Sequence, residues 1–227
     1  MIEIQDKALF IADSHYPHHG SEFLTILQQI DKKTINPTQL FLMGDNFDLL
    51  FGYNDYIQTF SKDAIELLQK ISLKLDIYYF EGNHDFCLKN IFTNIKIYSR
   101  EEQPIVFTLN SKKVALSHGD KFVTSLGYNL YSKLVRNKFL ITSLRPWEKS
   151  IINDRMNKLS KKTICNSFET LDKRVEKILK YYKDVELVIE GHFHQGKVVG
   201  KYISLPSLAC QGEVGVVENS NIVFKKI

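Results

Sequence analysis

The sequence predicts an α/β sandwich that carries a helical insertion, and three observations support this fold class. Short apolar runs that end in polar clusters recur along the chain, as is typical of buried strands. Helical patterns separate the first three runs, which gives the order strand, helix, strand, helix, strand. A basic stretch of helical pattern then precedes the last strands, and it predicts a helical insertion at residues 121–183.

The predicted strands are continuous apolar runs bounded by Gly, Asn, Asp or Ser. Five of them lead into polar clusters: Ala8–Ala12, Leu40–Met43, Ile77–Phe80, Val114–Leu116 and Leu187–Ile189. Runs of this length without alternation are typical of strands that are buried on both faces. Three further short strands are expected at Tyr202–Leu205, Gly215–Val217 and Ile222–Phe224.

The two early helices are predicted from apolar residues at three- and four-residue steps. Their apolar positions are Phe23, Leu24, Leu27 and Ile30, then Ile65, Leu68, Ile71 and Leu75. Ser21 precedes the first helix and is a suitable N-cap. Residues 104–117 differ, because Asn110 and Ser111 separate two strand-like runs and so predict a hairpin.

The composition is that of one globular domain. The chain has 227 residues, of which 44% are hydrophobic and 25% charged, and it shows no repeat or low-complexity linker. We therefore expect a single domain over residues 1–227, with the insertion as its cap.

With no signal-peptide pattern and no apolar run of the roughly 18 residues that span a bilayer, we expect a cytoplasmic protein. Cys87, Cys165 and Cys210 are widely spaced without a CxxC pair, so we expect reduced thiols with packing roles.

The charge is distributed unevenly along the chain. Residues 121–183 hold 15 Lys or Arg against 5 Asp or Glu, whereas the whole chain holds 30 against 26. The insertion is therefore strongly basic and the remainder net acidic. A basic field favours an anionic partner, such as a phosphorylated substrate or an acidic lipid surface. The alternative is a set of solvated basic helix faces without a partner.

Each of the five strand ends runs into residue types that bind metal ions. These are Asp13 and His15, Asp45 in GDNFD, Asn83 and His84 in GNHD, His118 in SHGD, and His192 with His194 in GHFH. Carboxylate, imidazole and amide oxygen are ligands of divalent ions, and ligands bind at the carboxyl ends of strands in α/β sheets. Any one of these histidines alone would be better explained as a structural residue. Five motifs in order favour a metal site, and only His18 and His19 lie outside them.

With these motifs the sequence resembles the calcineurin-like metallophosphoesterases, whose pattern is DxH, GDxxD, GNH followed by Asp or Glu, a further His, and GHxH. The resemblance spans residues 13–194 and implies a four-layer α/β/β/α sandwich with two divalent ions. Mn²⁺ is expected, with Fe²⁺ or Zn²⁺ as alternatives. The resemblance also implies the ligands of each ion. Asp13, His15 and His194 would bind one ion, Asn83, His118 and His192 would bind the other, and Asp45 would bridge both. A shared carboxylate suits this place, because it offsets repulsion between cations about 4 Å apart.

The same resemblance implies hydrolysis of a phosphoester by a metal-bound hydroxide. Two metal ions lower the pKa of a bound water towards about 7, so no Ser or Cys nucleophile is needed. His84 would donate a proton to the leaving oxygen, a role typically worth about 10²- to 10⁴-fold. The carboxylate of Asp48 would orient the His84 ring, the alternative for Asp48 being a turn cap. Asp85 and Asp120 would hold the ligands in place.

A finer resemblance is to the UDP-2,3-diacylglucosamine hydrolases of lipid A biosynthesis, which split a pyrophosphate to give lipid X and UMP. It rests on SHGDKFVTSLGYNLYSKLVRNK, RMNKLSKK, GNHDF and the basic insertion, although an Arg is usual where this chain has His84. It implies a lipid-linked nucleotide substrate, contacts at Asn83, His84, Ser160 and Lys161, and peripheral contact with the inner face of the membrane. An apolar stripe in the insertion would hold acyl chains, the alternative being that it packs on the core. Its residues are Leu140, Leu144, Trp147 and Ile151.

Three other functions are alternatives to this one. A phosphodiesterase or phosphatase of the same superfamily could act on nucleotides or nucleic acid, but no surface of interleaved aromatic and basic residues is apparent. GDNFDLL lacks the Arg of the protein-phosphatase form GDxxDRG. A non-catalytic scaffold would have lost ligand residues, whereas every ligand position here is filled.

Overall fold

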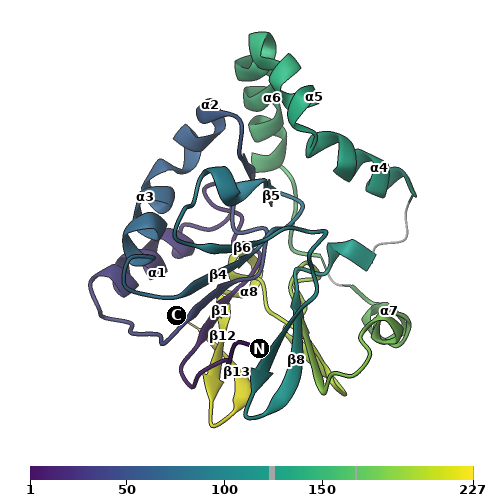
Figure 1. The fold of residues 1–227 in the computed structure, drawn as a ribbon. Coiled ribbons are helices and arrows are strands. Elements are labelled where there is room, and N and C mark those ends of the chain that lie inside the picture. Colours follow the sequence, from purple (N-terminus) through teal and green to yellow (C-terminus); the bar gives the residue numbers. More distant parts are fainter. Residues whose placement is uncertain (123–125, 167, 227) are drawn as a thin grey trace.

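The computed structural model describes residues 1–122, 126–166 and 168–226, and it shows two mixed β-sheets packed face to face (Figure 1). The strands of the larger sheet are β1 (Leu9–Ile11), β2 (Leu40–Leu42), β4 (Ile77–Phe80), β6 (Lys96–Tyr98), β12 (Glu213–Glu218) and β13 (Asn221–Lys226). Those of the second sheet are β7 (Ile105–Leu109), β8 (Lys112–Ser117), β9 (Leu187–Glu190), β10 (Lys197–Val199) and β11 (Tyr202–Ser204). Their orders are β13-β12-β1-β2-β4-β6 and β10-β11-β9-β8-β7, and a small third sheet pairs β3 (Leu50–Phe51) with β5 (Asp85–Phe86). The strands from β1 to β6 are parallel, as are β8, β9 and β11, so their carboxyl ends lie on one side.

Helices cover the outer face of each sheet. The α-helices are α1 (Glu22–Asp31), α2 (Asp55–Gln58), α3 (Lys62–Ile71), α4 (Leu126–Val135), α5 (Lys138–Ser143), α6 (Glu148–Ser160), α7 (Leu171–Ile178) and α8 (Leu208–Gln211). Short 3₁₀ turns are η1 (Thr59–Ser61), η2 (Leu88–Asn90), η3 (Asp120–Phe122), η4 (Arg145–Trp147) and η5 (Leu179–Tyr181). In β1, Leu9 and Ile11 pack with α1 and α3, whereas Phe10 packs between the sheets. In the second sheet, Ala115 and Val188 pack against α7. The predicted four-layer α/β/β/α sandwich is therefore confirmed.

The strands predicted from apolar runs are all present. The hairpin is present too, with Asn110 and Ser111 in the left-handed conformation that its tight turn needs, at φ 47° and 65°. Ser21 precedes α1, but its side chain makes no capping hydrogen bond, and α3 ends at Ile71, so Leu75 lies beyond it. The sequence did not predict β3, β5, β6, β10, α2 or α8. All six have four residues or fewer, too few to show a period.

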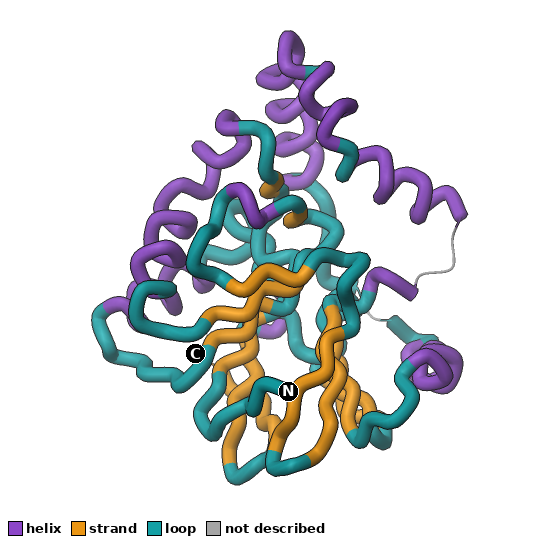
Figure 2. Tube along the Cα trace, viewed as in Figure 1, coloured by secondary structure: helices purple, strands orange, loops and turns teal. Residues whose placement is uncertain are grey.

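The basic insertion divides into two parts. Helices α4, α5 and α6 stand away from both sheets, above the carboxyl ends of the strands, and we call them the cap (Figures 1 and 2). Helix α7 instead forms the outer layer over the second sheet. Ile152 and Met156 of α6 pack on Ile57 of α2, which fixes the cap to the core. Residues 123–125 and 167 of the predicted insertion lie outside the described residues.

The apolar stripe of the cap does not pack on the core. Leu140, Leu144, Trp147 and Ile151 are 40%, 39%, 63% and 45% exposed, so the alternative of core packing is wrong.

Among the described residues, no helix has the length and apolar character required to cross a bilayer.

The expectation of three free thiols is also wrong. Cys165 and Cys210 form a disulfide across a sequence separation of 45 residues, and Cys87 is free. Their spacing carried no signal, because the pair depends on how the segment after α6 lies against α8. The bond ties these two elements together beside His194, whose Nδ1 lies 3.7 Å from the sulfur of Cys210.

Candidate metal centre

The predicted ligands follow the carboxyl ends of five strands, β1, β2, β4, β8 and β9. Five of them have φ between 48° and 65°: Asp13, His15, Asp45, His192 and His194. This left-handed backbone costs a non-glycine residue about 1–3 kcal/mol and is concentrated at functional sites. The turns also need glycine: a Cβ on Gly44 would lie 2.4 Å from His118, and one on Gly82 would lie 2.2 Å from Asp45. The backbone is therefore shaped to aim these side chains at one point.

The first cluster consists of Asp13, His15 and His194. One ligand atom from each lies within 4.8 Å of the others, and His194 Nε2 is 3.3 Å from Asp13 Oδ1. The other oxygen of Asp13 accepts a hydrogen bond from the main-chain N–H of His192, at 2.8 Å. Among the described residues, both ring nitrogens of His15 are buried without a hydrogen-bond partner. Buried polar atoms are rarely left unpaired, so these nitrogens fit a metal ion.

The second cluster consists of Asp45, His118 and His192, with Asn83 at its edge. His118 Nε2 lies 3.5 Å from Asp45 Oδ2, 3.2 Å from His192 Nδ1 and 3.4 Å from Asn83 Oδ1. The main-chain N–H of His84 donates to Asp45 Oδ1 at 2.8 Å, which leaves Oδ2 directed at His118. The structure thus brings all seven predicted ligands into two adjoining clusters, with the oxygen and nitrogen donors that divalent ions bind.

The electrostatics of the two clusters complement a cation. Burial disfavours the charged form of Asp45, but His118 and His84 overcome this effect and hold its pKa well below the usual value. Burial likewise opposes the charge of His118, yet Asp45 raises the pKa of His118 well above normal. Burial lowers the pKa of both His15 and His192 to about 4, so these rings are neutral at pH 7. Two ionised carboxylates among buried imidazoles form an anionic pocket once the histidines are deprotonated.

The ligand loops are held by a second layer of polar residues. Asp85 accepts hydrogen bonds from the main-chain N–H groups of Asp45, Asn46 and Gly82 and from the Tyr79 hydroxyl. Burial, and then the charge of Asp45, raise the pKa of Asp85 to about 7. The expected supporting role of Asp85 therefore has a structural basis.

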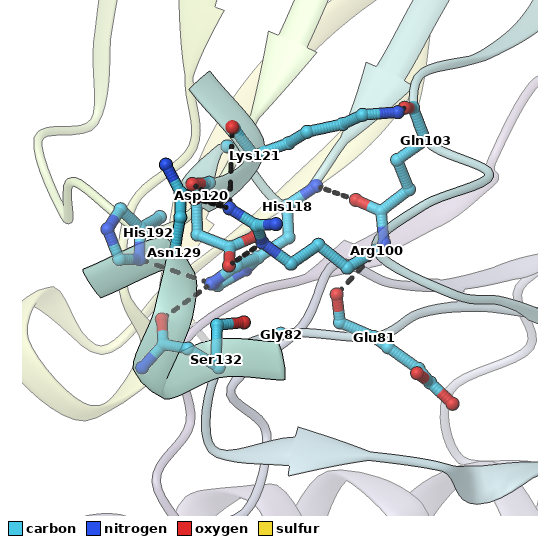
Figure 3. A network of polar contacts seen from close by, with 12 residues as sticks. Glu81, Gly82, Arg100, Gln103, His118, Asp120, Lys121, Asn129, Ser132 and His192 are labelled. Carbon is cyan, nitrogen blue, oxygen red and sulfur yellow. Dashed lines mark hydrogen bonds and ion pairs between the residues drawn. The ribbon is translucent and has the colours of Figure 1, made fainter. Parts of the chain in front are cut away.

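Around His118 a similar network is visible (Figure 3). The main-chain oxygen of Met43 lies 2.8 Å from Nδ1 of His118, so Nε2 faces the cluster. Gln103 accepts from the main-chain N–H of His118 at 2.6 Å, and Asp120 pairs with Arg100 at 2.7 Å. The loop that carries His118 is therefore fixed on both sides of this ligand.

The role expected for the Asp48 carboxylate needs correction. His84 Nδ1 lies 2.6 Å from the main-chain oxygen of Asp48, not from its carboxylate. That carboxylate instead accepts from the rings of His18 and His19, each at 2.8 Å, and from the main-chain N–H of His18. The ring of His19 reaches the main-chain oxygen of Lys162 with its other nitrogen, at 3.0 Å. No role was predicted for these two histidines, although their position three and four residues after His15 of the DxH motif was a usable signal.

Two hollows meet at the metal clusters. The smaller, of about 240 Å³, is lined by residues 162–164, 166 and 168 and by five of the seven predicted ligands, which are His15, Asp45, Asn83, His192 and His194. The larger, of about 390 Å³, is lined mainly by apolar residues of the cap and of β3 and β5. Asn83 and His84 line both hollows, as expected of substrate contacts. Ser160 and Lys161 line neither of them, and the segment that begins one residue later lies there instead.

Comparisons with known proteins show the family to which the chain belongs. The family described as calcineurin-like phosphoesterase matches residues 7–196. The UDP-2,3-diacylglucosamine hydrolase of Histophilus somni strain 129Pt is 29% identical over 208 residues, covering 85% of this chain and 86% of that protein. The protein of that name from Vibrio vulnificus strain CMCP6 is 23% identical over 198 residues, covering 84% and 82%. A solved archaeal phosphodiesterase aligns with 97% of this chain and 98% of its own, at 13% identity and a TM-score of 0.48. The chain therefore belongs to the calcineurin-like phosphoesterase family and is a metal-dependent phosphoester hydrolase.

Proposed function

We propose that this enzyme hydrolyses the pyrophosphate of UDP-2,3-diacylglucosamine, or of a close relative, to UMP and an acylated sugar phosphate. The observation that carries the proposal is that an apolar hollow adjoins the metal clusters and shares Asn83 and His84 with them. A substrate that fills both hollows has an apolar part beside a phosphate. The curated relatives bear the name of such an enzyme.

The larger hollow suits acyl chains with an anion at one end. Leu140, Ile141, Leu144 and Ile151 of the cap line it, opposite Leu49, Phe51 and Phe86 of the core. Arg136 lines the same hollow and donates a hydrogen bond to the main-chain oxygen of Gly82 at 2.8 Å. Its guanidinium carbon lies over the Phe86 ring, 5.0 Å from the ring centroid. Its Nε is buried without a hydrogen-bond partner among the described residues. We infer that this guanidinium attracts the diphosphate.

The chemistry follows from the groups around the clusters. Two divalent ions, Mn²⁺ in our proposal, would neutralise phosphoryl oxygens and lower the pKa of a bound water when bound there. Asp13, His15 and His194 would hold one ion, Asn83, His118 and His192 the other, and Asp45 both. Because Nδ1 of His84 is engaged by a carbonyl, Nε2 remains for the substrate, and the protonated ring can pass a proton to the leaving oxygen.

The exposed face of the cap fits a membrane surface. Phe139 is 85% exposed, Trp147 63% and Leu130 62%, and basic residues such as Lys138, Arg145 and Lys149 lie near them in the chain. Apolar side chains together with positive charge bind acidic bilayers. We propose peripheral contact through this face, which would give access to a lipid-linked substrate on the inner side of the membrane.

The test is a comparison of substrates under added Mn²⁺. We expect UMP and an acylated sugar phosphate from UDP-2,3-diacylglucosamine, with kcat/KM at least 100-fold above that for a soluble aryl phosphodiester, measured by ³¹P NMR and mass spectrometry. Faster cleavage of nucleotides or single-stranded DNA would instead support the nucleotide and nucleic-acid alternative. No cleavage of any phosphoester, with less than one metal ion bound per chain, would support a scaffold.

A further inference from the structure

Arg174, on the outer helix α7, reaches inward to the two loops that carry three of the metal ligands. Its Nη2 donates to the main-chain oxygen of Gly119 at 3.0 Å. Its Nη1 donates to Glu190 Oε2 at 2.9 Å and to the hydroxyl of Tyr202 at 3.1 Å. The guanidinium carbon lies 3.8 Å from the ring centroid of Phe193. One side chain therefore contacts two separate loops and the strand beside them.

Two of these contacts, at Gly119 and Phe193, lie next to predicted ligands in the sequence. Gly119 follows His118, and Phe193 stands between His192 and His194. The Phe193 ring also meets the His192 ring edge-on, with centroids 4.8 Å apart. A shift of the Arg174 side chain would thus be felt at all three histidines.

Glu190, two residues before His192, makes the arrangement rigid. Its carboxylate is fully buried and accepts hydrogen bonds from the hydroxyls of Ser117, Tyr182 and Tyr202 besides Arg174. Burial and the Glu190 charge raise the pKa of Tyr182 well above normal, so that hydroxyl stays a donor. A buried carboxylate is stable only when it is paired, and Arg174 supplies the opposite charge.

We infer that Arg174 is a positioning residue, which holds His118, His192 and His194 in the geometry that binds metal. Packing of α7 does not require it, because Leu171, Val175 and Ile178 already bury an apolar face against the sheet. A guanidinium suits this role, because its planar group of N–H donors can hydrogen-bond to two loops and stack on an aromatic ring at the same time. The inference rests on the proposed two-metal centre.

The test measures Mn²⁺ binding to protein stripped with a chelator, by calorimetry and by metal analysis after desalting. We expect Arg174→Met to raise the Mn²⁺ concentration for half-saturation by about 10- to 100-fold, the usual effect of losing a residue that orients ligands. Excess Mn²⁺ should restore kcat, because Arg174 does not touch the substrate. Arg174→Lys keeps the charge without the fork and should recover only part of the affinity. The matched control is Lys177→Met, which removes an exposed charge from the same helix.

Two results separate this inference from its alternatives. If Arg174→Met remains folded and binds Mn²⁺ as the natural protein does, Arg174 serves only to pack α7 and the inference fails. If the natural chain itself binds no Mn²⁺, the proposed metal centre fails instead. Should Arg174→Met not fold, the double variant Arg174→Met/Glu190→Gln removes both members of the buried pair, and unchanged affinity in it would equally overturn the inference.

Discussion

At the scale of single residues, adjacent positions in the GNHD turn have different tasks. Asn83 points at His118 of the second cluster, whereas His84 presents its ring to both hollows while its main-chain N–H orients Asp45. We therefore expect the His84 side chain to be separable from metal binding. We expect the carboxylate of Asp45 to be required for it, because this carboxylate lies in the second cluster beside His118.

Replacement of these two residues should have different consequences. We expect His84→Ala to retain both metal ions and to lose about 10²- to 10⁴-fold in kcat, the usual value of a general acid. Asp45→Ala should lose metal, with turnover falling as a result. Metal analysis and steady-state kinetics on the same preparations decide this, and equal metal loss in both variants would contradict the division of roles.

Protons should compete with metal at His118. The raised pKa of His118 means that its ring carries a proton at neutral pH when no metal is bound. A metal ligand must be neutral, so binding displaces this proton, and affinity for Mn²⁺ rises as the pH rises. We expect a net release of protons when Mn²⁺ binds at pH 7, measured by calorimetry in two buffers of different ionisation enthalpy. Affinity that is constant between pH 6.5 and 8 would refute this.

At the scale of elements, sequence analysis succeeded where a local pattern reflects burial. The runs at β1, β2 and β4 are continuous because one side of each strand packs on helices and the other on the second sheet. The same analysis could not distinguish α7 from the cap helices, because all are amphipathic and basic. Whether a helix covers a sheet or stands above it depends on contacts between distant segments.

The metal site shows the same division. That the predicted ligands lie close together could be expected from the sequence, because each stands in a short motif at a strand end. The partners of the Asp48 carboxylate could not be predicted, because they depend on the path of the chain at His18 and His19. The contacts of Arg174 could not be predicted either, because its partners Glu190 and Gly119 lie 16 and 55 residues away in the sequence.

The cap stripe can now be divided into residues that line the hollow and residues that do not. Leu140 and Leu144 line it, whereas Trp147 does not. We expect Leu140→Ser/Leu144→Ser to reduce kcat/KM for a soluble acylated substrate at least tenfold, since each lost apolar contact costs about 1.5 kcal/mol. Cleavage of an aryl phosphodiester should be unchanged. Leu73→Ser, at a residue 70% exposed after α3, is the control, and equal losses on both substrates would point to a folding defect.

The disulfide between Cys165 and Cys210 makes a direct chemical prediction. Alkylation in denaturant without reductant should label Cys87 alone, and all three thiols should react after reduction. Closing a loop of 45 residues stabilises the fold by about 4 kcal/mol in the chain-entropy treatment, so reduction should lower Tm. Mass spectrometry gives the labels and calorimetry the Tm. Three labelled cysteines before reduction would refute the bond.

At the scale of the whole molecule, the metal centre joins parts that are distant in sequence. Asp13 and Asp45 follow strands of the larger sheet, and His118 and His192 follow strands of the other. Without a cation, the left-handed ligand turns and the unpaired nitrogens of His15 are unfavourable. Metal should therefore stabilise the contact between the sheets as well as serve catalysis.

This coupling predicts that metal raises the thermal stability of the entire domain. At 1,000 times its Kd, a ligand that binds only the folded state adds about 4 kcal/mol, which for a chain of this length raises Tm by roughly 10 °C. Calorimetry in Mn²⁺ and after chelation measures the shift. Asp45→Ala should show little of it, because that variant lacks the carboxylate proposed to hold both ions. A similar shift in Asp45→Ala would mean that Mn²⁺ stabilises the protein from another site.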